Sequence, residues 1–320
     1  MRGMNIDKLK NKVLNGGQIT KEEALFLANA ELDELACAAD EIRRAYCKAD
    51  FDMCAVMSVK GGRCSENCRF CSQASCSSAE VNAFALLDTE TILAKARLRD
   101  MQGIRHFCLV SSGRKLNNNE IDKICESVRA IRENTNIKIC TSLGLLNEEQ
   151  FCRLKAAGVS RIHNNLEVSE SYFPNICTSH TYEEKLETIH AAKRAGLEIC
   201  CGGIIGVGET MEDRIDMALA IRKLGADSVP INLLDPVLGT PLGDMPVIEE
   251  NLVKRIIALY RFILPNVYVR LAAGRDYISD GGLSCFLAGS NATITGDMLT
   301  VMGISIEKDL ETIRGLGYEL

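Results

Sequence analysis

Short apolar runs alternate with segments of helical periodicity along most of the chain. Eight runs have the length and composition of buried strands, the last with the weakest pattern: 54–58, 106–110, 137–141, 161–165, 198–204, 228–233, 267–272 and 285–289. Helical patterns fall between most of these runs. Strands and helices that alternate in this way predict an α/β fold with a parallel sheet, most simply a (β/α)8 barrel of the TIM type. An open doubly wound sheet is the alternative.

Capping signals indicate where several helices begin. Three segments carry Thr followed three residues later by an acidic residue, namely Thr20-x-x-Glu23, Thr181-x-x-Glu184 and Thr210-x-x-Asp213. A further helix is expected from Asn119 to about Asn134. Residues 6–48 read as helices that precede the first strand. We therefore expect residues 1–50 to be an N-terminal helical cap and residues 51–320 to be the barrel, together forming one domain.

Charge and hydropathy exclude some classes of function. The 320 residues are 47% hydrophobic and carry a net charge of -6 at pH 7, and no basic cluster suggests nucleic-acid binding. Residues 1–17 contain no apolar signal-peptide core, and no run of 18 apolar residues occurs. We therefore expect a cytoplasmic enzyme with no membrane or nucleic-acid partner.

The chain is rich in cysteine. Its 15 cysteines are odd in number and irregularly spaced, which disfavours a disulfide framework. In a reducing compartment such cysteines are metal ligands, catalytic groups or buried small apolar residues. Cys125 shows the last case, since it shares a helical apolar face with Ile121, Ile124 and Val128.

Three of the cysteines form a compact loop directly after the first strand. Cys64, Cys68 and Cys71 have C-x3-C-x2-C spacing, with Phe70 before the third cysteine. Three thiolates on a four-iron cluster leave one iron open, whereas clusters that only carry electrons use four cysteines. A structural zinc site is the alternative, but it would require a fourth Cys or His ligand. The loop resembles that of the radical S-adenosylmethionine enzymes.

Other cysteines fall within predicted strands. Cys108, Cys140 and Cys200 lie in the second, third and fifth strands, and Arg270 lies in the seventh. Side chains that point inward from different strands of a barrel converge, so these residues predict a second metal site inside the barrel. The alternative for each cysteine alone is a small buried apolar residue. The arginine favours the metal site, because a buried guanidinium needs an anionic acceptor.

With these motifs the chain resembles the biotin synthase family over residues 52–317. The resemblance rests on residues 64–73, 107–108, 138–144, 165–167, 200–209, 228–232, 268–275 and 285–289. The resemblance implies sulfur insertion between two unactivated carbons of dethiobiotin, the last step of biotin biosynthesis. It implies a [4Fe-4S] cluster, S-adenosylmethionine and an auxiliary iron–sulfur cluster that supplies sulfur. Acid–base groups cannot activate an aliphatic C–H bond, so a radical cofactor is required.

The resemblance assigns roles to individual residues. Cys64, Cys68 and Cys71 hold the first cluster, which binds S-adenosylmethionine, and Cys108, Cys140, Cys200 and Arg270 hold the auxiliary cluster. The S-adenosylmethionine contacts are Phe70, Asn165, Glu167, Lys185, Ile204 and Gly206. His163 and Asn232 are implied to contact dethiobiotin. The glycines of Gly202-x-Ile204-x-Gly206-x-x-Glu209 are equally consistent with a tight turn that follows the strand.

Three positions depart from the usual family pattern. His163 stands where the family usually has Asn. Lys185 stands where the family usually has an Arg, which would bind the methionine carboxylate of S-adenosylmethionine through two hydrogen bonds. Their alternatives are a hydrogen-bonded barrel residue and an exposed helix charge. Cys201 replaces Ser, and it either faces the helices or acts as an extra auxiliary ligand. The second case would allow a four-iron auxiliary cluster with extra sulfide instead of [2Fe-2S].

Two other functions remain open at this point. The chain could be another barrel radical enzyme, of the hydrogenase-maturase or methylornithine-synthase type, or an iron–sulfur electron carrier without catalytic activity. The biotin synthase resemblance further implies a small electron donor of the flavodoxin or ferredoxin type and a homodimer.

Overall fold

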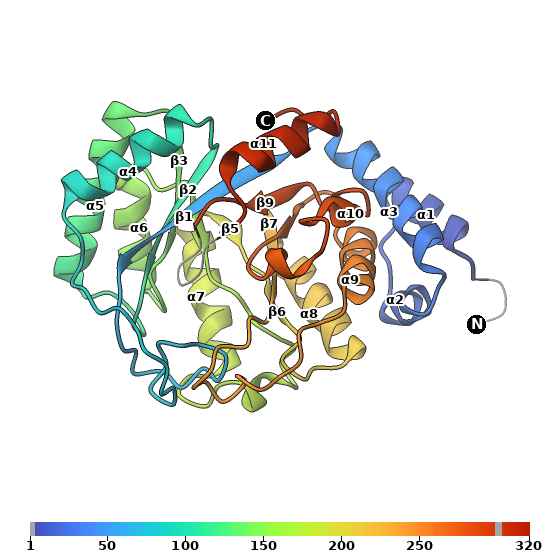
Figure 1. The fold of residues 1–320 in the computed structure, drawn as a ribbon, viewed down its shortest axis with the longest axis horizontal. Coiled ribbons are helices and arrows are strands. Elements are labelled where there is room, and N and C mark those ends of the chain that lie inside the picture. The colour runs from blue at the N-terminus through green and yellow to red at the C-terminus, as the bar shows by residue number, and fades with distance from the viewer. Residues whose placement is uncertain (1–3, 298–302) are drawn as a thin grey trace.

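A closed ring of parallel strands forms the centre of the molecule (Figure 1). The computed structural model describes residues 4–297 and 303–320. The strands are β1 (Asp52–Lys60), β2 (His106–Ser111), β3 (Lys138–Ser142), β4 (Arg161–His163), β5 (Glu198–Cys200), β6 (Gly203–Ile205), β7 (Ser228–Leu233), β8 (Tyr268–Leu271) and β9 (Ala292–Ile294). Their order is β5-β4-β3-β2-β1-β9-β8-β7-β6, and the ring closes where β5 also pairs with β7, at Cys200 and Ser228. The predicted TIM-type barrel is confirmed.

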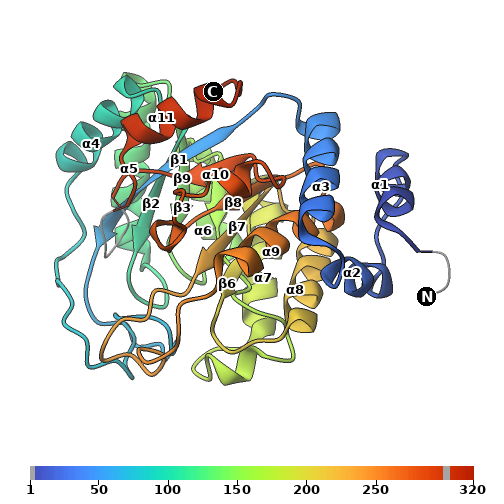
Figure 2. The same ribbon diagram turned by 45° about the vertical axis from the view of Figure 1, so that its right-hand side comes forward.

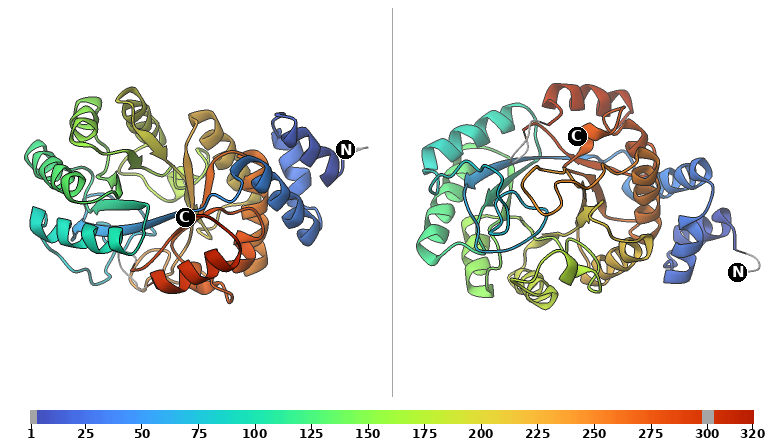
Figure 3. Two further views of the ribbon diagram at one scale, coloured as in Figure 1. Left: turned by 90° about the horizontal axis from the view of Figure 1, so that it is seen from above. Right: turned by 60° about the horizontal axis from the view of Figure 1, so that its bottom comes forward.

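Helices surround the ring on its outer side (Figure 3, left). Those between the strands are α4 (Thr89–Met101), α5 (Asn118–Asn134), α6 (Glu148–Ala157), α7 (Tyr182–Arg194), α8 (Met211–Leu224) and α9 (Glu250–Ile263). The predicted capping boxes are present at the starts of α7 and α8. At α5 the cap is Asn117, two residues before the predicted start. No helix in residues 4–297 and 303–320 has the length and apolarity needed to span a membrane.

Of the N-terminal helices, the second and third lie against the outer side of α8 and α9, and the first packs on the third (Figure 2). They are α1 (Ile6–Leu14), α2 (Lys21–Ala28) and α3 (Leu32–Cys47), and α2 begins with the predicted Thr20 capping box. Lys21 Nζ bonds Asp216 Oδ2 at 2.8 Å, and Arg255 donates to the Ala30 carbonyl at 2.6 Å. Polar contacts thus supplement the apolar packing between these helices and the barrel.

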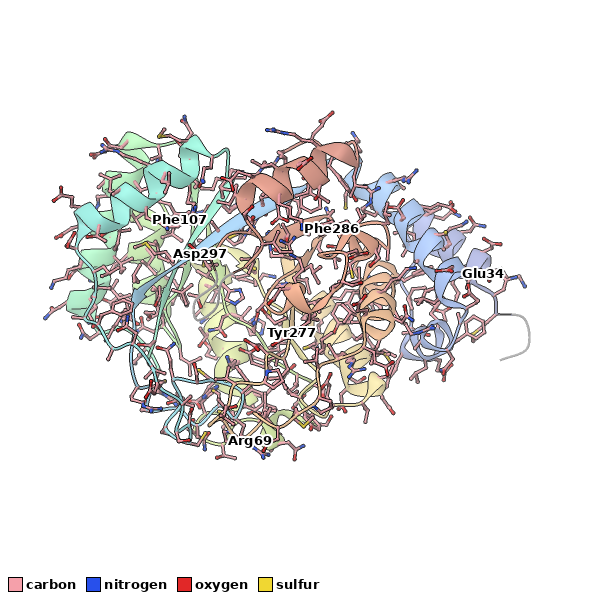
Figure 4. All side chains as sticks on the ribbon, viewed as in Figure 1. Glu34, Arg69, Phe107, Tyr277, Phe286 and Asp297 are labelled. Atoms are coloured by element: carbon pink, nitrogen blue, oxygen red, sulfur yellow. The ribbon has the colours of Figure 1, made fainter. Side chains whose placement is uncertain are left out.

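The eighth strand was assigned wrongly from the sequence. Residues 285–289 do not form a strand: the short helix α10 (Leu283–Phe286) occupies part of this segment, and the strand is β9. A short apolar run does not distinguish a strand from a buried helical turn. Here Phe286, labelled in Figure 4, packs edge-on against Phe51 with ring centroids 5.2 Å apart. The final helix, α11 (Ile306–Gly315), follows β9.

The fifth predicted strand, 198–204, is divided into β5 and β6 at Cys201 and Gly202. A Cβ atom at Gly202 would lie only 1.9 Å from the Pro230 carbonyl oxygen, so only glycine allows this approach to β7. The Gly202 carbonyl accepts from the Leu166 backbone N–H at 3.0 Å. The break therefore brings the segment after β4 against the barrel rim.

Long loops cross the carboxyl ends of the strands (Figure 3, right). The loop after β1 contacts the loop after β7, where Ser78 N donates to the Gly239 carbonyl at 2.8 Å. Active sites of such barrels form at this end, from the loops that follow the strands.

Candidate active site

The cysteine loop begins where β1 ends, so Cys64, Cys68 and Cys71 lie at the mouth of the barrel. Backbone hydrogen bonds shape it, including Cys64 N to the Gln73 carbonyl at 2.7 Å and Cys71 N to the Cys68 carbonyl at 3.0 Å. The Glu66 N–H points at Cys64 Sγ, 3.4 Å away, as a donor to a thiolate would. The three cysteines are partly exposed. Three thiols in a short loop with one backbone donor fit an iron–sulfur cluster.

A buried carboxylate ties this loop to residues 177–180. Glu66 accepts from Ser179 Oγ at 2.7 Å and from His180 Nδ1 at 2.5 Å. Burial opposes ionisation of Glu66, but these bonds and that from Arg114 outweigh it and lower its pKa. Cys177 Sγ lies 3.7 Å from Cys68 Sγ. Their hydrogen bond lowers the pKa of Cys177 and raises that of Cys68.

An outer cavity of about 180 Å³ lies beside the loop, and Cys64, Cys68, Asn165, Glu167 and Lys185 line it. Lys185 is therefore not an exposed helix charge: its side chain is 12% exposed and its Nζ lies 3.7 Å from Glu167 Oε1. Asn165 Oδ1 accepts from Gly202 N at 3.0 Å, which fixes the amide. A cation, a carboxylate and an amide thus face the same space beside the cysteine loop.

Residues 206–209 form a tight turn after β6. Gly206 N and Val207 N donate to the two Glu209 carboxylate oxygens at 2.9 and 2.8 Å. Gly206 has a positive φ of 91°, which favours glycine. Ile204 is buried and its N–H donates to the Glu167 carbonyl at 2.7 Å. Neither Ile204 nor Gly206 lines the outer cavity or the second cavity that lies deeper in the barrel. Phe70 packs against the apolar core.

An inner cavity of about 280 Å³ occupies the barrel beneath the outer one. Its sulfur-bearing and polar lining comes from different strands and includes Cys54, Cys108, Cys140, Cys200, Arg161, His163, Asn232 and Arg270. Cys108 and Cys140 are direct neighbours in the register of β2 and β3. Asn232 Nδ2 donates to the Gly203 carbonyl at 3.0 Å, which leaves its second N–H for a ligand. The structure therefore brings together the three strand cysteines and Arg270.

His163 and Ser142 line both cavities, so the two spaces adjoin. His163 Nδ1 lies 3.5 Å from Cys200 Sγ. Burial opposes the charged forms of both groups, but their hydrogen bond outweighs it and raises the pKa of His163. Burial also opposes the Cys200 thiolate, but the same hydrogen bond, together with the charges of His163, Arg270 and Arg161, lowers the pKa of Cys200 to about 7. His163 is thus hydrogen-bonded inside the barrel and lies in the wall that the two cavities share.

Cys201 points away from the inner cavity. It is fully buried in the apolar core, and it does not line either cavity. The thiol instead influences Tyr182 of α7: burial raises the pKa of that phenol, and Cys201 adds to the rise. This is the orientation toward the helices that strand alternation predicts for a residue next to Cys200.

A buried ionic network closes the inner cavity toward the amino ends of the strands. Asp52, fully buried, accepts from Arg270 Nη2 at 2.5 Å, Arg161 Nη1 at 3.1 Å and His106 Nδ1 at 2.7 Å. Burial would raise the pKa of Asp52, but Arg270, His106 and Arg161 hold it far below its usual range. We refer to Asp52, His106, Arg161 and Arg270 as the ionic floor.

Sequence reasoning missed several residues of the site. Asp52 and Cys54 lie on β1 at alternate positions with Val56, so period-two alternation could have placed all three inside the barrel. Cys177 and His180 lie in the loop after β4, far from the cysteine loop in sequence. No spacing pattern connects residues that only the tertiary fold brings together.

Comparisons with known proteins agree with this arrangement. Profiles match the Radical SAM superfamily at residues 58–221 and the Biotin and Thiamin Synthesis associated domain at residues 230–319. Biotin synthase of Brachyspira hyodysenteriae is 46% identical over 99% of this chain and 95% of the relative. Biotin synthase of Akkermansia muciniphila is 47% identical over 98% of this chain and 97% of the relative. The chain belongs to the biotin synthase family.

Solved structures support the same fold. Methylornithine synthase superposes with a TM-score of 0.83 at 19% identity, over 97% of this chain and 96% of that protein. A maturase of the [FeFe]-hydrogenase superposes with a TM-score of 0.81 at 18% identity, over 98% of this chain and 74% of that protein. At such identities the likeness concerns the barrel alone. Membership of the biotin synthase family, within the radical S-adenosylmethionine enzymes, implies S-adenosylmethionine and a [4Fe-4S] cluster, and the cysteine loop supplies the donors that such a cluster requires.

Proposed function

We propose that this protein converts dethiobiotin to biotin by inserting sulfur between two unactivated carbons. The observation that carries the proposal is the shared wall of the two cavities: a cysteine loop opens on the outer one, and three strand cysteines line the inner one. When bound, the [4Fe-4S] cluster and S-adenosylmethionine supply a 5'-deoxyadenosyl radical, and an auxiliary cluster supplies sulfide. Family membership at 46% identity over nearly the whole chain supports this substrate.

The residues around these groups position the reactants. Lys185 provides the charge for the carboxylate of S-adenosylmethionine, and Asn165 with Glu167 provides acceptors for its ribose hydroxyls. His163 and Asn232 face the space between the cysteine loop and the strand thiols, where the ureido ring of dethiobiotin would be held. Barrel walls exclude water, which protects a radical from side reactions. Holding the reacting carbons close to the sulfur source is the main contribution of the protein.

The radical reaction also requires an electron donor. We propose a small acidic carrier of the flavodoxin or ferredoxin type, because Arg63 and Arg69 are exposed on the cysteine loop, with Arg69 at the lower edge of Figure 4. Family resemblance further implies a homodimer and a cytoplasmic location. Size-exclusion chromatography and cell fractionation test these two expectations.

The decisive test is an anaerobic assay of the reconstituted protein with dithionite, S-adenosylmethionine and dethiobiotin. We expect biotin together with about two 5'-deoxyadenosines per biotin, since each of two C–H bonds consumes one radical. Formation of 5'-deoxyadenosine without biotin would remove dethiobiotin as the substrate. A Cys68→Ala variant is the control, and it should form neither product.

A further inference from the structure

Cys54 places a fourth thiol in the inner cavity. It lies on β1, and its side chain packs in one cluster with those of Cys108 and Cys140. Cys200 lines the same cavity from the other side. Cys54 Sγ makes a hydrogen bond of 3.6 Å to the Ala55 carbonyl, a weak contact that a metal bond would readily replace. Four thiols from four strands therefore line one cavity.

Arg270 is committed to the protein around it. Its Nε donates to Ser228 Oγ at 3.2 Å, and its Nη1 donates to the carbonyls of Thr293 and Asp52 at 2.7 and 3.2 Å. Its Nη2 donates to Asp52 Oδ2 at 2.5 Å. A guanidinium has five N–H donors and no acceptor, so these contacts use four donors and leave one.

A metal ligand must offer a lone pair, and a protonated guanidinium offers none. The guanidinium of Arg270 pairs with the buried carboxylate of Asp52 and bonds Ser228 and Thr293, so direct binding of iron would have to break contacts that these strands provide. The remaining N–H can instead donate to a sulfur atom and balance negative charge. The same strand that supplies this carboxylate supplies the Cys54 thiol two residues later, on the same face of β1.

We propose that the inner site holds its cluster through four thiolates, those of Cys54, Cys108, Cys140 and Cys200. Arg270 is then a positioning residue that donates one hydrogen bond to the cluster and is not an iron ligand. This inference rests on the auxiliary cluster of the proposed function and changes the ligand set that the sequence resemblance implied. Arg161 and Arg270 share one fully buried carboxylate, Asp52, and the other acidic partner of Arg161, Glu198, is 48% exposed, so the buried charge beside the cavity is cationic, which suits a cluster with four thiolates.

The first test isolates the inner cluster in a background in which Cys64, Cys68 and Cys71 are replaced by Ala. After anaerobic reconstitution with ⁵⁷Fe, iron and sulfide are counted and Mössbauer spectra are recorded for this parent and for Cys54→Ser. We expect Cys54→Ser either to bind at most half of the parent's iron or to show an iron site with a higher isomer shift. An unchanged iron content with an unchanged spectrum would overturn the proposal.

Cys201→Ser is the matched control, since the same atom changes in a buried residue next to Cys200 that faces the helices. We expect its iron content and spectrum to equal those of the parent. A loss in Cys201→Ser that equals the loss in Cys54→Ser would show that any buried Cys→Ser change disturbs the site, and would overturn the specific role of Cys54. Circular dichroism of both variants shows whether they are folded.

The second test needs no substitution at the inner site. In the triple-Ala parent labelled with ¹⁵N-arginine, pulsed EPR of the reduced inner cluster should show only the weak nitrogen coupling of a hydrogen-bonded guanidinium. A strong ¹⁵N coupling, of the size seen for directly bound nitrogen, would make Arg270 a ligand and overturn the proposal. A parent that binds no iron would remove the inner cluster and the ligand set together. Failure of biotin formation with these spectra intact would count against the substrate alone.

Discussion

Asp52 is the residue on which the arrangement of the inner site depends. It is the acidic partner of Arg270, Arg161 and His106, and it has no exposed surface. A buried cation whose partner is removed is far more costly than a well-paired one. Asp52 therefore stabilises the fold and sets the charge of the cavity at the same time.

We expect Asp52→Asn to destabilise the protein by about 3–5 kcal/mol, the cost of breaking a buried ion pair from one side. Urea unfolding of the metal-free protein, followed by circular dichroism, measures this difference. Glu198→Gln is the control, since Glu198 also pairs with Arg161 but its side chain is 48% exposed, and the change should cost no more than about 1 kcal/mol. Equal effects of the two substitutions would contradict the special role of the buried carboxylate.

Lys185 offers a second prediction for a single residue. Removing a charged donor for the S-adenosylmethionine carboxylate costs about 1.5–3 kcal/mol, so Lys185→Ala should weaken S-adenosylmethionine binding roughly 10- to 100-fold. Equilibrium dialysis under anaerobic conditions measures the dissociation constant. Lys185→Arg keeps the charge and should retain affinity close to that of the unchanged protein. Full affinity in Lys185→Ala would exclude this contact.

Among the elements, the divided strand of β5 and β6 explains how the rim of the outer cavity is formed. The break at Gly202 lets the backbone near Asn165 and Glu167 bond across to it. Glu167 itself has a φ of 72°, which is rare for a residue with a side chain. The strain is located where the carboxylate must face the cavity.

We expect Gly202→Ala to cost about 1–3 kcal/mol, as overpacking usually does, because a Cβ at this position would meet the Pro230 carbonyl at 1.9 Å. Thermal unfolding of the metal-free protein measures the loss. Gly315→Ala, at a helical site with nothing within 4 Å of the added Cβ, should be neutral or slightly stabilising. If Gly202→Ala unfolds at the same temperature as the unchanged protein, the close approach is not a constraint.

The elements themselves were largely predictable, because strand length and helix caps are local signals. Seven of the eight predicted strands overlap observed ones, and the capping boxes at Thr20, Thr181 and Thr210 are present. The error at 285–289 arose because burial of Phe286 against Phe51 depends on tertiary packing. The division at Gly202 depends on the Pro230 carbonyl of a neighbouring strand, which no local pattern shows.

For the whole molecule, the proposed function makes the adjoining cavities the places where the radical would form and where it would react. His163 lies in the wall between them. We expect His163→Ala to raise the ratio of 5'-deoxyadenosine to biotin severalfold, because a larger gap lets the radical be quenched before it meets its target carbon. Chromatography with mass spectrometry measures both products. His163→Asn, which restores the usual family residue, should keep a ratio near that of the unchanged protein; a ratio unaffected by His163→Ala would contradict this arrangement.

The residues of the site were predictable only where they lie close together in the sequence or match a family motif. Cys64, Cys68 and Cys71 share one loop, and the resemblance to a family supplied Cys108, Cys140 and Cys200. The contributions of Cys54 and Asp52 depend on the register of β1 against β2 and β9, which is a property of the closed barrel. A one-residue change of register would turn both side chains toward the helices.

The ionic floor has a consequence for the lifetime of the protein as a catalyst. Arg161 and Arg270 line the inner cavity and pair with the buried Asp52 at the amino ends of the strands, whereas Ser142 and His163 line the side that it shares with the outer cavity. If this shared side is the entrance to the inner cavity, iron and sulfide would enter by the route proposed for dethiobiotin. Under the proposed function, rebuilding of the auxiliary cluster and binding of dethiobiotin would then use the same entrance, so product release would have to precede rebuilding.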